Sequence, residues 1–255
     1  MPPAAGLPGH IPRSAFPGAR PVSSTAMSES PASRPTAAIR AVVFDVGETL
    51  VDESRLWLRW ADRLGVTPLT FLGALGACAA GDRPVEDAFE LVRPGIDVAA
   101  EDAAWETDDP GGLRNGFDAD DLYPDVRPAL TQLRKLGLRL VIAGNQPPRA
   151  LESLRAMDLP IDVIRNSAEL GVEKPEPEFF VAAAELAGMP PQNIAYVGDR
   201  IDNDVLPAAD AGMRPILIRR GPWGHLHARR PESSRATIID SLLELPTVLT
   251  GDSSA

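Results

Sequence analysis

Short apolar segments alternate with amphipathic helical patterns over most of this chain. Apolar runs typical of buried strands occur at residues 41–44, 138–143, 161–164, 194–197 and 215–218. Apolar residues at helical spacing lie between or beside them, at residues 126–136, 149–157, 178–187 and 204–211. Because strands that alternate with helices of this length form right-handed βαβ units, we predict an α/β fold with a doubly wound, parallel, Rossmann-like sheet.

One segment interrupts this alternation. Residues 53–120 contain no convincing strand, but they show helical patterns at residues 56–64, 69–79 and 85–92. The insertion follows the first predicted strand, so we expect a small helical cap over the carboxyl ends of the strands. Open parallel sheets bind ligands at that edge, and an insertion there is suited to act as a lid.

The remaining segments complete the domain organisation. Residues 1–37 hold eight of the 26 prolines and show no periodicity, so we expect a disordered tail, in which Met27 offers a second initiation point. We expect the α/β core at residues 38–52 and 121–248, with the cap at residues 53–120. A flexible C-terminus is expected at residues 249–255.

The charge and cysteine content restrict the partners and the compartment. A formal net charge of −11 gives no electrostatic footprint for nucleic acid or for an anionic membrane. No apolar run approaches the roughly 18 to 20 residues that a membrane helix needs. The single cysteine, Cys78, cannot form an internal disulfide, which fits a reducing compartment. We therefore expect a cytoplasmic protein without nucleic-acid or membrane partners, of unspecified oligomeric state.

Residues able to carry chemistry fall at the carboxyl ends of the predicted strands. The stretches are FDVGETL at residues 44–50, Gly144-Asn145, Lys174-Pro175 and GDRIDND at residues 198–204. In this order and spacing, the first, third and fourth stretches resemble the haloacid dehalogenase superfamily of hydrolases, over about residues 38–248. The helical insertion is similar to the first-position cap of that family. The resemblance implies a phosphatase-like hydrolase.

Phosphoryl transfer assigns a role to each of these side chains. Asp45, at a strand end, can attack a phosphate and form a covalent aspartyl phosphate. Asp199 and Asp204 offer the oxygen ligands that suit Mg²⁺, and the ion would bridge Asp45 and the phosphate. Lys174 would supply a second positive charge. Only Lys135 and Lys174 among the 25 basic residues are lysines, and a compact ammonium fits between a carboxylate and a phosphate better than a guanidinium does.

The sequence departs from the family pattern at two positions. The family's phosphatases usually carry a second Asp, as general acid and base, where this chain has Gly47. That role is typically worth about 10² to 10⁴ in rate. By resemblance, Gly47 still offers its main-chain carbonyl to the metal, and Glu48 is a weak candidate for the missing acid. Gly144 stands where the family usually places Ser or Thr, so we expect phosphate to meet the main-chain N–H groups of Gly144 and Asn145.

Three functions remain open at this point. We favour a Mg²⁺-dependent hydrolase that cleaves a small phosphomonoester or acyl phosphate, with a small phosphorylated metabolite as its substrate. The first alternative is a catalytically impaired protein that binds a phosphate ligand. The second is a metal-independent haloacid dehalogenase, which the retention of Asp199 and Asp204 disfavours.

Other polar and aromatic features have structural interpretations. The eight acidic residues of segment 101–121 are expected on a solvated cap edge. His225 and His227 are spaced for a metal, but such a pair is more often a surface or packing feature. We expect the cap tryptophans, Trp57 among them, to pack in a core.

Overall fold

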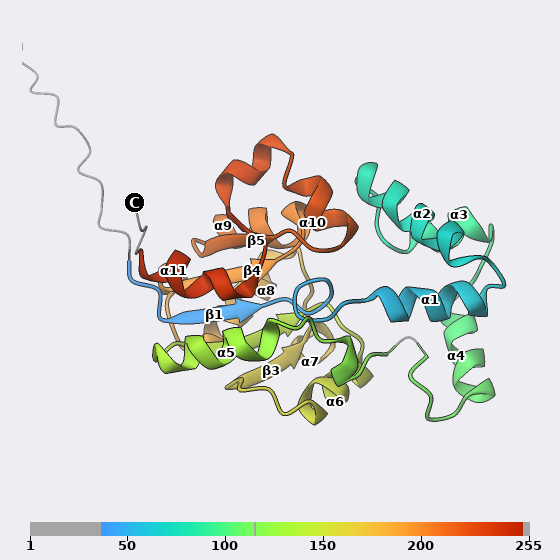
Figure 1. Cartoon of the computed structure of the whole chain (residues 1–255), viewed down its shortest axis with the longest axis horizontal. Coiled ribbons are helices and arrows are strands. Elements are labelled where there is room, and N and C mark those ends of the chain that lie inside the picture. Colours follow the sequence, from blue (N-terminus) through green and yellow to red (C-terminus); the bar gives the residue numbers. More distant parts are fainter. Residues whose placement is uncertain (1–36, 115, 252–255) are drawn as a thin grey trace, which may run out of the picture. The chain divides into compact units, whose positions relative to one another are not determined.

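A six-stranded parallel sheet lies at the centre of the computed structural model, which describes residues 37–114 and 116–251 (Figure 1). The strands lie in the order β3-β2-β1-β4-β5-β6. Their bounds are Ala41–Phe44 (β1), Arg139–Gly144 (β2), Val163–Asn166 (β3), Ile194–Gly198 (β4), Arg214–Ile218 (β5) and Thr237–Ile239 (β6). The predicted doubly wound parallel sheet is confirmed, and β6 is an edge strand that the sequence pattern did not reveal.

The strand order places a ligand-binding crevice beside β1. The chain proceeds from β1 to β2 and β3 on one side, and then returns to β4, β5 and β6 on the other. The direction of winding therefore reverses at β1, whose residue Phe44 pairs with Ile142 of β2 and with Val197 of β4. Residues that follow β1, β2 and β4 meet at this reversal point, where doubly wound sheets bind their ligands.

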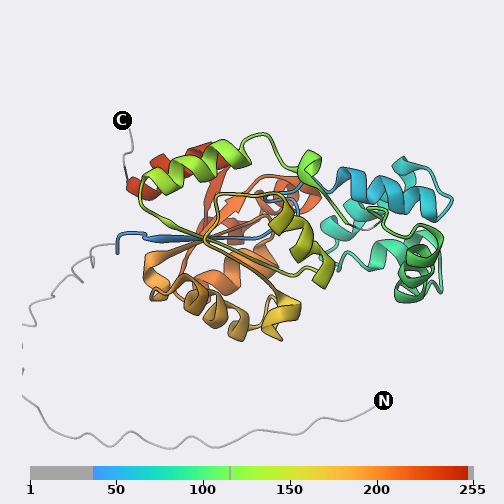
Figure 2. The ribbon, with the colours of Figure 1, turned by 90° about the horizontal axis from the view of Figure 1, so that it is seen from below.

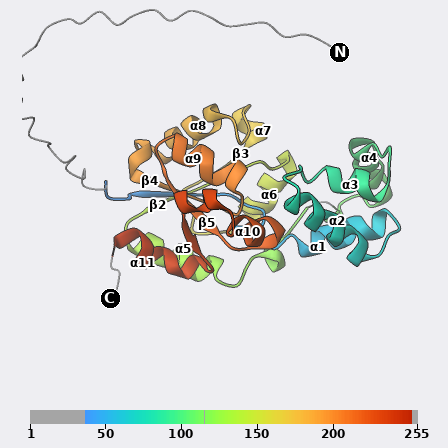
Figure 3. The same cartoon turned by 90° about the horizontal axis from the view of Figure 1, so that it is seen from above.

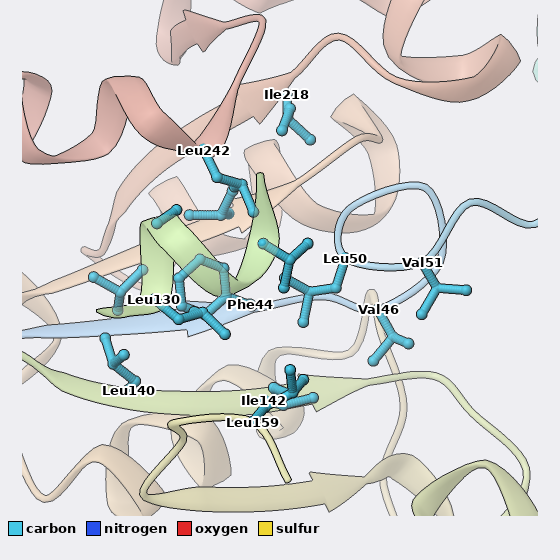
Figure 4. Close-up of a cluster of buried hydrophobic side chains, with 14 of the residues drawn as sticks. Phe44, Val46, Leu50, Val51, Leu130, Leu140, Ile142, Leu159, Ile218 and Leu242 are labelled. Atoms are coloured by element: carbon cyan, nitrogen blue, oxygen red, sulfur yellow. The ribbon is translucent and has the colours of Figure 1, made fainter. Parts of the chain in front are cut away.

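Helices cover both faces of the sheet (Figures 2 and 3). One face carries α5 (Val126–Lys135), α6 (Pro148–Ala156) and α11 (Leu245–Thr250), and the other carries α8 (Pro177–Ala187) and α9 (Leu206–Asp210). Two shorter helices lie beside these layers: α7 (Ser167–Leu170) follows β3, and α10 (Gly221–His227) follows β5 and packs against the insertion through Trp223. Figure 4 shows Phe44 of β1, Ile142 of β2 and Leu130 of α5 as members of one cluster, and all three are fully buried. This burial on both faces explains the continuous apolar strands.

Four helices make up the insertion after β1. They are α1 (Ser54–Arg63), α2 (Pro68–Ala80), α3 (Asp87–Val92) and α4 (Val98–Asp108). They lie beyond the carboxyl end of β1 (Figure 1). Trp60 packs edge-on against Phe89 and Trp105, with ring centroids 4.8 and 5.0 Å away. Helix α4 went unpredicted because Trp105 is its single buried residue, so it lacks an apolar stripe.

Two expectations concern the ends of the chain and membranes. The predicted tail at residues 1–37 lies, up to residue 36, outside the described residues, as do residues 252–255 of the predicted flexible C-terminus.

Among the described residues, no single helix is long and apolar enough to cross a membrane. Helices α1 and α2 together meet that criterion by length and composition alone, with a bend of 118° between them.

Candidate active site

The turn after β1 presents Asp45 at the end of the strand. The Asp45 N–H donates to the Val197 carbonyl of β4 at 2.9 Å, which continues the sheet by one residue. The next residues form a tight turn, in which the Leu50 N–H donates to the Val46 carbonyl at 2.8 Å. The side chains of Val46, Leu50 and Val51 are buried in the core under this turn (Figure 4). The position of the Asp45 carboxylate is therefore fixed by packing on both sides of it.

Lys174 lies between two carboxylates. Its Nζ donates to Asp45 Oδ1 at 2.6 Å and to Asp204 Oδ1 at 2.7 Å, and its side chain is 2% exposed. Burial lowers the pKa of Lys174, but Asp204 and Asp45 outweigh it and raise that pKa well above its ordinary value. The ammonium therefore stays charged. Lys135, in contrast, is exposed on α5.

Asn145 positions the main chain of Lys174. Its Nδ2 donates to the Lys174 carbonyl, and its Oδ1 accepts from the Lys174 N–H, each at 2.8 Å. Both ends of the amide are thereby occupied, which leaves the main-chain N–H of Asn145 as the group able to meet a phosphate. The pairing of residues 145 and 174 links the end of β2 to the loop between α7 and α8 that carries Lys174, which we call the lysine loop. Sequence reasoning did not foresee this pairing.

Three buried carboxylates form a group that suits a divalent cation. Oxygen atoms of Asp45, Asp199 and Asp204 all lie within 4.8 Å of one another. Asp204 belongs to a π-helical turn, η3 (Ile201–Val205), and its Oδ2 accepts from the Arg200 N–H at 2.9 Å. One ammonium, that of Lys174, faces all this negative charge. Hard oxygen donors with excess negative charge fit Mg²⁺.

The pKa values of this group reflect the same imbalance. Burial, followed by repulsion from Asp204 and Asp45, raises the pKa of Asp199 well above its ordinary value. Burial is also the largest cause that raises the pKa of Asp204, to about 6, against the opposing effect of Lys174. A divalent cation would remove this repulsion.

Gly47 faces a carboxylate that sequence reasoning missed. A Cβ atom at residue 47 would lie 2.4 Å from Glu53 Oε1 and 2.8 Å from Glu53 Cδ. The half-buried side chain of Glu53 thus fills the space that a side chain at residue 47 would enter. Burial, with repulsion from Glu48 and Asp45, raises the pKa of Glu53 to about 8. No motif spacing signals Glu53, because it lies outside the FDVGETL stretch.

Glu48 braces the turn. Its φ of +49° lies in the left-handed region, which glycine adopts more readily than glutamate does. Its Oε2 accepts from the Tyr123 hydroxyl at 2.5 Å, and its Oε1 accepts from the Glu53 N–H at 3.1 Å. Burial is the largest cause that raises the pKa of Glu48. Both carboxyl oxygens are engaged in holding the turn.

Gly144 leaves room for the Asp45 carboxylate. A Cβ atom at residue 144 would lie 2.5 Å from Asp45 Oδ1. Serine or threonine in this position would therefore push the carboxylate away from its present place beside Lys174. The absence of a side chain at residue 144 and the orientation of Asp45 are coupled.

The histidines and acidic residues singled out from the sequence lie apart from the carboxylate group. His227 is fully buried and its Nδ1 accepts from the Ile201 N–H at 2.9 Å, which is a packing role. Burial is the main cause that lowers its pKa to about 4. His225 is exposed. Asp202 pairs with Arg200 at 2.6 Å. In segment 101–121, exposed Asp108 pairs with Arg63 of α1 at 2.6 Å.

A cavity of about 630 Å³ joins the carboxylates to the helical insertion. Its core side includes Asp45, Asn145, Lys174 and Asp199. Its other side is mostly apolar and is formed by residues of α1 to α3 and the loop between α2 and α3, with Glu86 as its acidic member: Leu56, Trp57, Trp60, Leu75, Val85, Glu86 and Phe89. Trp57 and Trp60 therefore pack in the hydrophobic cluster of the insertion, as expected, and also line the cavity.

Comparisons with known proteins agree with this architecture. A glyceraldehyde 3-phosphate phosphatase of Methanopyrus kandleri is 36% identical over 130 residues, covering 50% of this chain and 56% of the relative. The chain thus spans about half the length of that curated relative.

Two solved structures share the fold. YfnB, a hydrolase of Bacillus subtilis solved with bound magnesium, has a TM-score of 0.60 at 18% identity, covering 84% of this chain and 99% of that one. An L-2-haloacid dehalogenase has a TM-score of 0.61 at 21% identity, covering 84% and 100%. The profile of the haloacid dehalogenase-like hydrolases matches residues 39–212. This chain therefore belongs to the haloacid dehalogenase-like hydrolase family.

Proposed function

We propose that this protein is a Mg²⁺-dependent phosphatase that cleaves a small phosphomonoester or acyl phosphate through an aspartyl phosphate at Asp45. The observation that carries the proposal is the meeting of Asp45, Asp199 and Asp204 around the Lys174 ammonium. The phosphatase relative supports the same reaction class. A cytoplasmic location remains a prediction from the sequence.

The residues divide the reaction into two displacements. Asp45 attacks phosphorus, so that a new bond forms to its carboxylate oxygen while the bond to the leaving oxygen breaks. Water then attacks the same phosphorus and releases phosphate and free Asp45. Lys174 offsets charge on Asp45 and on the phosphoryl oxygens in both steps. The N–H groups of Gly144 and Asn145 would orient the phosphoryl group.

The metal site would be formed by residues of this chain alone. Asp45, Asp199 and Asp204, together with the Gly47 carbonyl, would hold Mg²⁺. When bound, the ion would neutralise charge that develops on the transferring phosphoryl group. A dehalogenase that needs no metal would not require three buried carboxylates so close together, which favours the phosphatase over that alternative.

Turnover of a panel of phosphorylated metabolites, with and without Mg²⁺, tests the proposal. Wild type should turn over with Mg²⁺, and Asp45→Asn should not. Equal activity of the two proteins would contradict the assignment of Asp45 as nucleophile. Mg²⁺-dependent binding of a phosphate analogue without any turnover would favour a binding protein, and halide release without metal would favour a dehalogenase.

A further inference from the structure

A phosphatase built on Asp45 needs a proton for its leaving group, and Gly47 cannot provide one. An alcohol leaves as an alkoxide unless it is protonated as the bond to phosphorus breaks. If the protein is the proposed phosphatase, on which this inference rests, and cleaves esters of alkyl alcohols, another side chain has to reach the place where a side chain at residue 47 would act.

The carboxyl group of Glu53 lies in that place. The Cβ position of residue 47 is 2.4 Å from Glu53 Oε1 and 3.3 Å from Oε2, so the two groups cannot coexist there. Glu53 lines the same cavity as Asp45 and Lys174. Its carboxyl group therefore lies beside Gly47, in the cavity that Asp45 also lines.

Helix capping does not account for the Glu53 carboxyl group, whose side-chain partner in α1 is Trp57. It is the N-cap residue of α1, yet its side chain accepts no capping hydrogen bond from that helix. Thr67 and Asp97 show the ordinary behaviour, because their side chains cap α2 and α4 by accepting from the N–H groups of Thr70 and Ala100. Glu53 also forms no ion pair within the described residues.

Glu48, the candidate that the sequence offered, is engaged elsewhere. Its two carboxyl oxygens accept from the Tyr123 hydroxyl and from the Glu53 N–H. That second bond orients the main chain from which the Glu53 side chain extends. Glu48 thus helps to fix the main chain at Glu53.

We propose that Glu53 is the general acid and base of this enzyme. In the first step Asp45 bonds to phosphorus, the bond to the leaving oxygen breaks, and the Glu53 carboxyl proton moves to that oxygen, which gives the alcohol. In the second step water bonds to phosphorus, the Asp45–phosphorus bond breaks, and the Glu53 carboxylate takes the proton of that water. The net reaction is phosphomonoester plus water to alcohol plus phosphate.

Leaving-group dependence in a single turnover tests this role. With Glu53→Gln and enzyme in excess, release of ethanol from ethyl phosphate should fall about 10² to 10⁴-fold. Release of 4-nitrophenol from 4-nitrophenyl phosphate should fall less than tenfold, because that group leaves without a proton. Glu185→Gln, on the exposed side of α8, should match wild type on both substrates. Equal loss on both substrates, or no loss on either, would overturn the role of Glu53.

A second variant moves the acid back to residue 47. Gly47→Asp/Glu53→Ala removes the carboxyl group that blocks the Cβ position and places another near it, so ethyl phosphate cleavage should recover at least tenfold over Glu53→Ala. No recovery in a folded double variant would contradict the proposal. Failure of wild type on every phosphate ester would instead contradict the phosphatase function itself, whatever Glu53 does.

The charges that line the cavity bear on the rest of the substrate. The lining residues include six acidic ones and two basic ones, Lys174 and Arg200. Lys174 is held between Asp45 and Asp204, and Arg200 is paired with Asp202 and lies over the Trp223 ring at 5.0 Å. Each cation of the described lining thus already has a carboxylate partner, and Arg200 pairs with Asp202 through its Nε and Nη2 atoms.

We infer that the substrate of the proposed phosphatase carries an uncharged, apolar group beyond its phosphate. The apolar wall formed by Leu56, Val85 and Phe89 would receive that group and remove it from water. A carboxylate in place of that apolar group would lose its hydration against the apolar wall and near acidic side chains. No unpaired cation of the described lining would offset this loss.

Binding of matched phosphonates, which needs no turnover, tests this inference. By calorimetry with Mg²⁺, 3-methylbutylphosphonate should bind wild type at least tenfold more tightly than 3-phosphonopropanoate, which has the same shape with a carboxylate end. Val85→Lys, which adds a cation to the apolar wall, should reduce this ratio at least tenfold. Equal or tighter binding of the carboxylate by wild type would overturn the inference, as would a preference for 3-aminopropylphosphonate.

Discussion

Asn145 holds the main chain of Lys174 through both ends of its side-chain amide, at 2.8 Å each, although the two residues are 29 positions apart. The lysine loop is thereby tied to the end of β2, and the Lys174 ammonium reaches Asp45 and Asp204 from a fixed base. The position of the Lys174 ammonium therefore depends on Asn145, at the end of β2, as well as on its own loop.

Asn145→Ala should weaken both the fold and the site. It leaves two partly buried main-chain groups of Lys174 without partners, which costs on the order of 1 to 3 kcal/mol in the free energy of unfolding. We also expect a lower kcat, because the ammonium loses its fixed base. Urea denaturation and steady-state kinetics measure the two effects. An unchanged urea midpoint would show that Asn145 does not support the loop.

Lys174→Met should abolish most of the turnover, while Lys135→Met should have no effect. Removal of one preorganised charge at a phosphoryl site typically costs about 10² to 10³ in kcat. Lys135 is a matched chemical control because it is the other lysine of the chain and is exposed on α5. The comparison is made on kcat at saturating substrate and Mg²⁺. Similar values for the two variants would remove Lys174 from the mechanism.

Asp199→Asn should change the response of stability to Mg²⁺. In wild type, Mg²⁺ at a hundredfold excess over its Kd should stabilise the folded state by about 2.7 kcal/mol. The variant should lose most of this gain, yet unfold at a higher temperature than wild type in EDTA, because one of three crowded carboxylates becomes neutral. Thermal unfolding in EDTA and in Mg²⁺ measures both.

The control for this comparison is Asp202→Asn, whose carboxylate is paired with Arg200 and lies outside the group of three. It should keep the full response to Mg²⁺. A normal response of Asp199→Asn would place the metal elsewhere.

Acid should destabilise the fold through His227. Burial lowers its pKa to about 4 in the folded protein, against 6.5 for an unperturbed histidine, so the unfolded chain binds a proton that the folded one rejects. His227 therefore does not lower the free energy of unfolding above pH 6.5. As the pH drops from 6.5 toward 4, it lowers that free energy by about 3 kcal/mol at most. Arg230 and Arg200 oppose protonation, and Asp202 and Asp82 favour it.

His227→Asn isolates this contribution, because its Oδ1 can still accept from the Ile201 N–H. Other groups with raised pKa values, such as Asp204, act in the opposite direction in both proteins. Urea denaturation between pH 7 and pH 4.5 should therefore show a smaller loss of stability in the variant. Parallel curves for the two proteins would contradict the low pKa of His227.

Much of the fold follows from local patterns. The runs at residues 41–44 and 194–197 became β1 and β4 nearly residue for residue, because strands buried on both faces need continuous apolar sequence. The three-residue β6 (Thr237–Ile239) and helix α4 escaped prediction, because one is too short for a period and the other buries a single side chain.

The sequence by itself determined the α/β class, the helical insertion and the candidates Asp45, Lys174, Asp199 and Asp204, since residues that follow parallel strands must meet at one edge of the sheet. Only the tertiary structure brought a carboxyl group, that of Glu53, beside Gly47. Glu53 comes six residues later, and its carboxyl group reaches Gly47 because of the left-handed turn at Glu48 and the direction in which α1 begins. Such through-space contacts depend on side-chain directions that no spacing along the chain encodes.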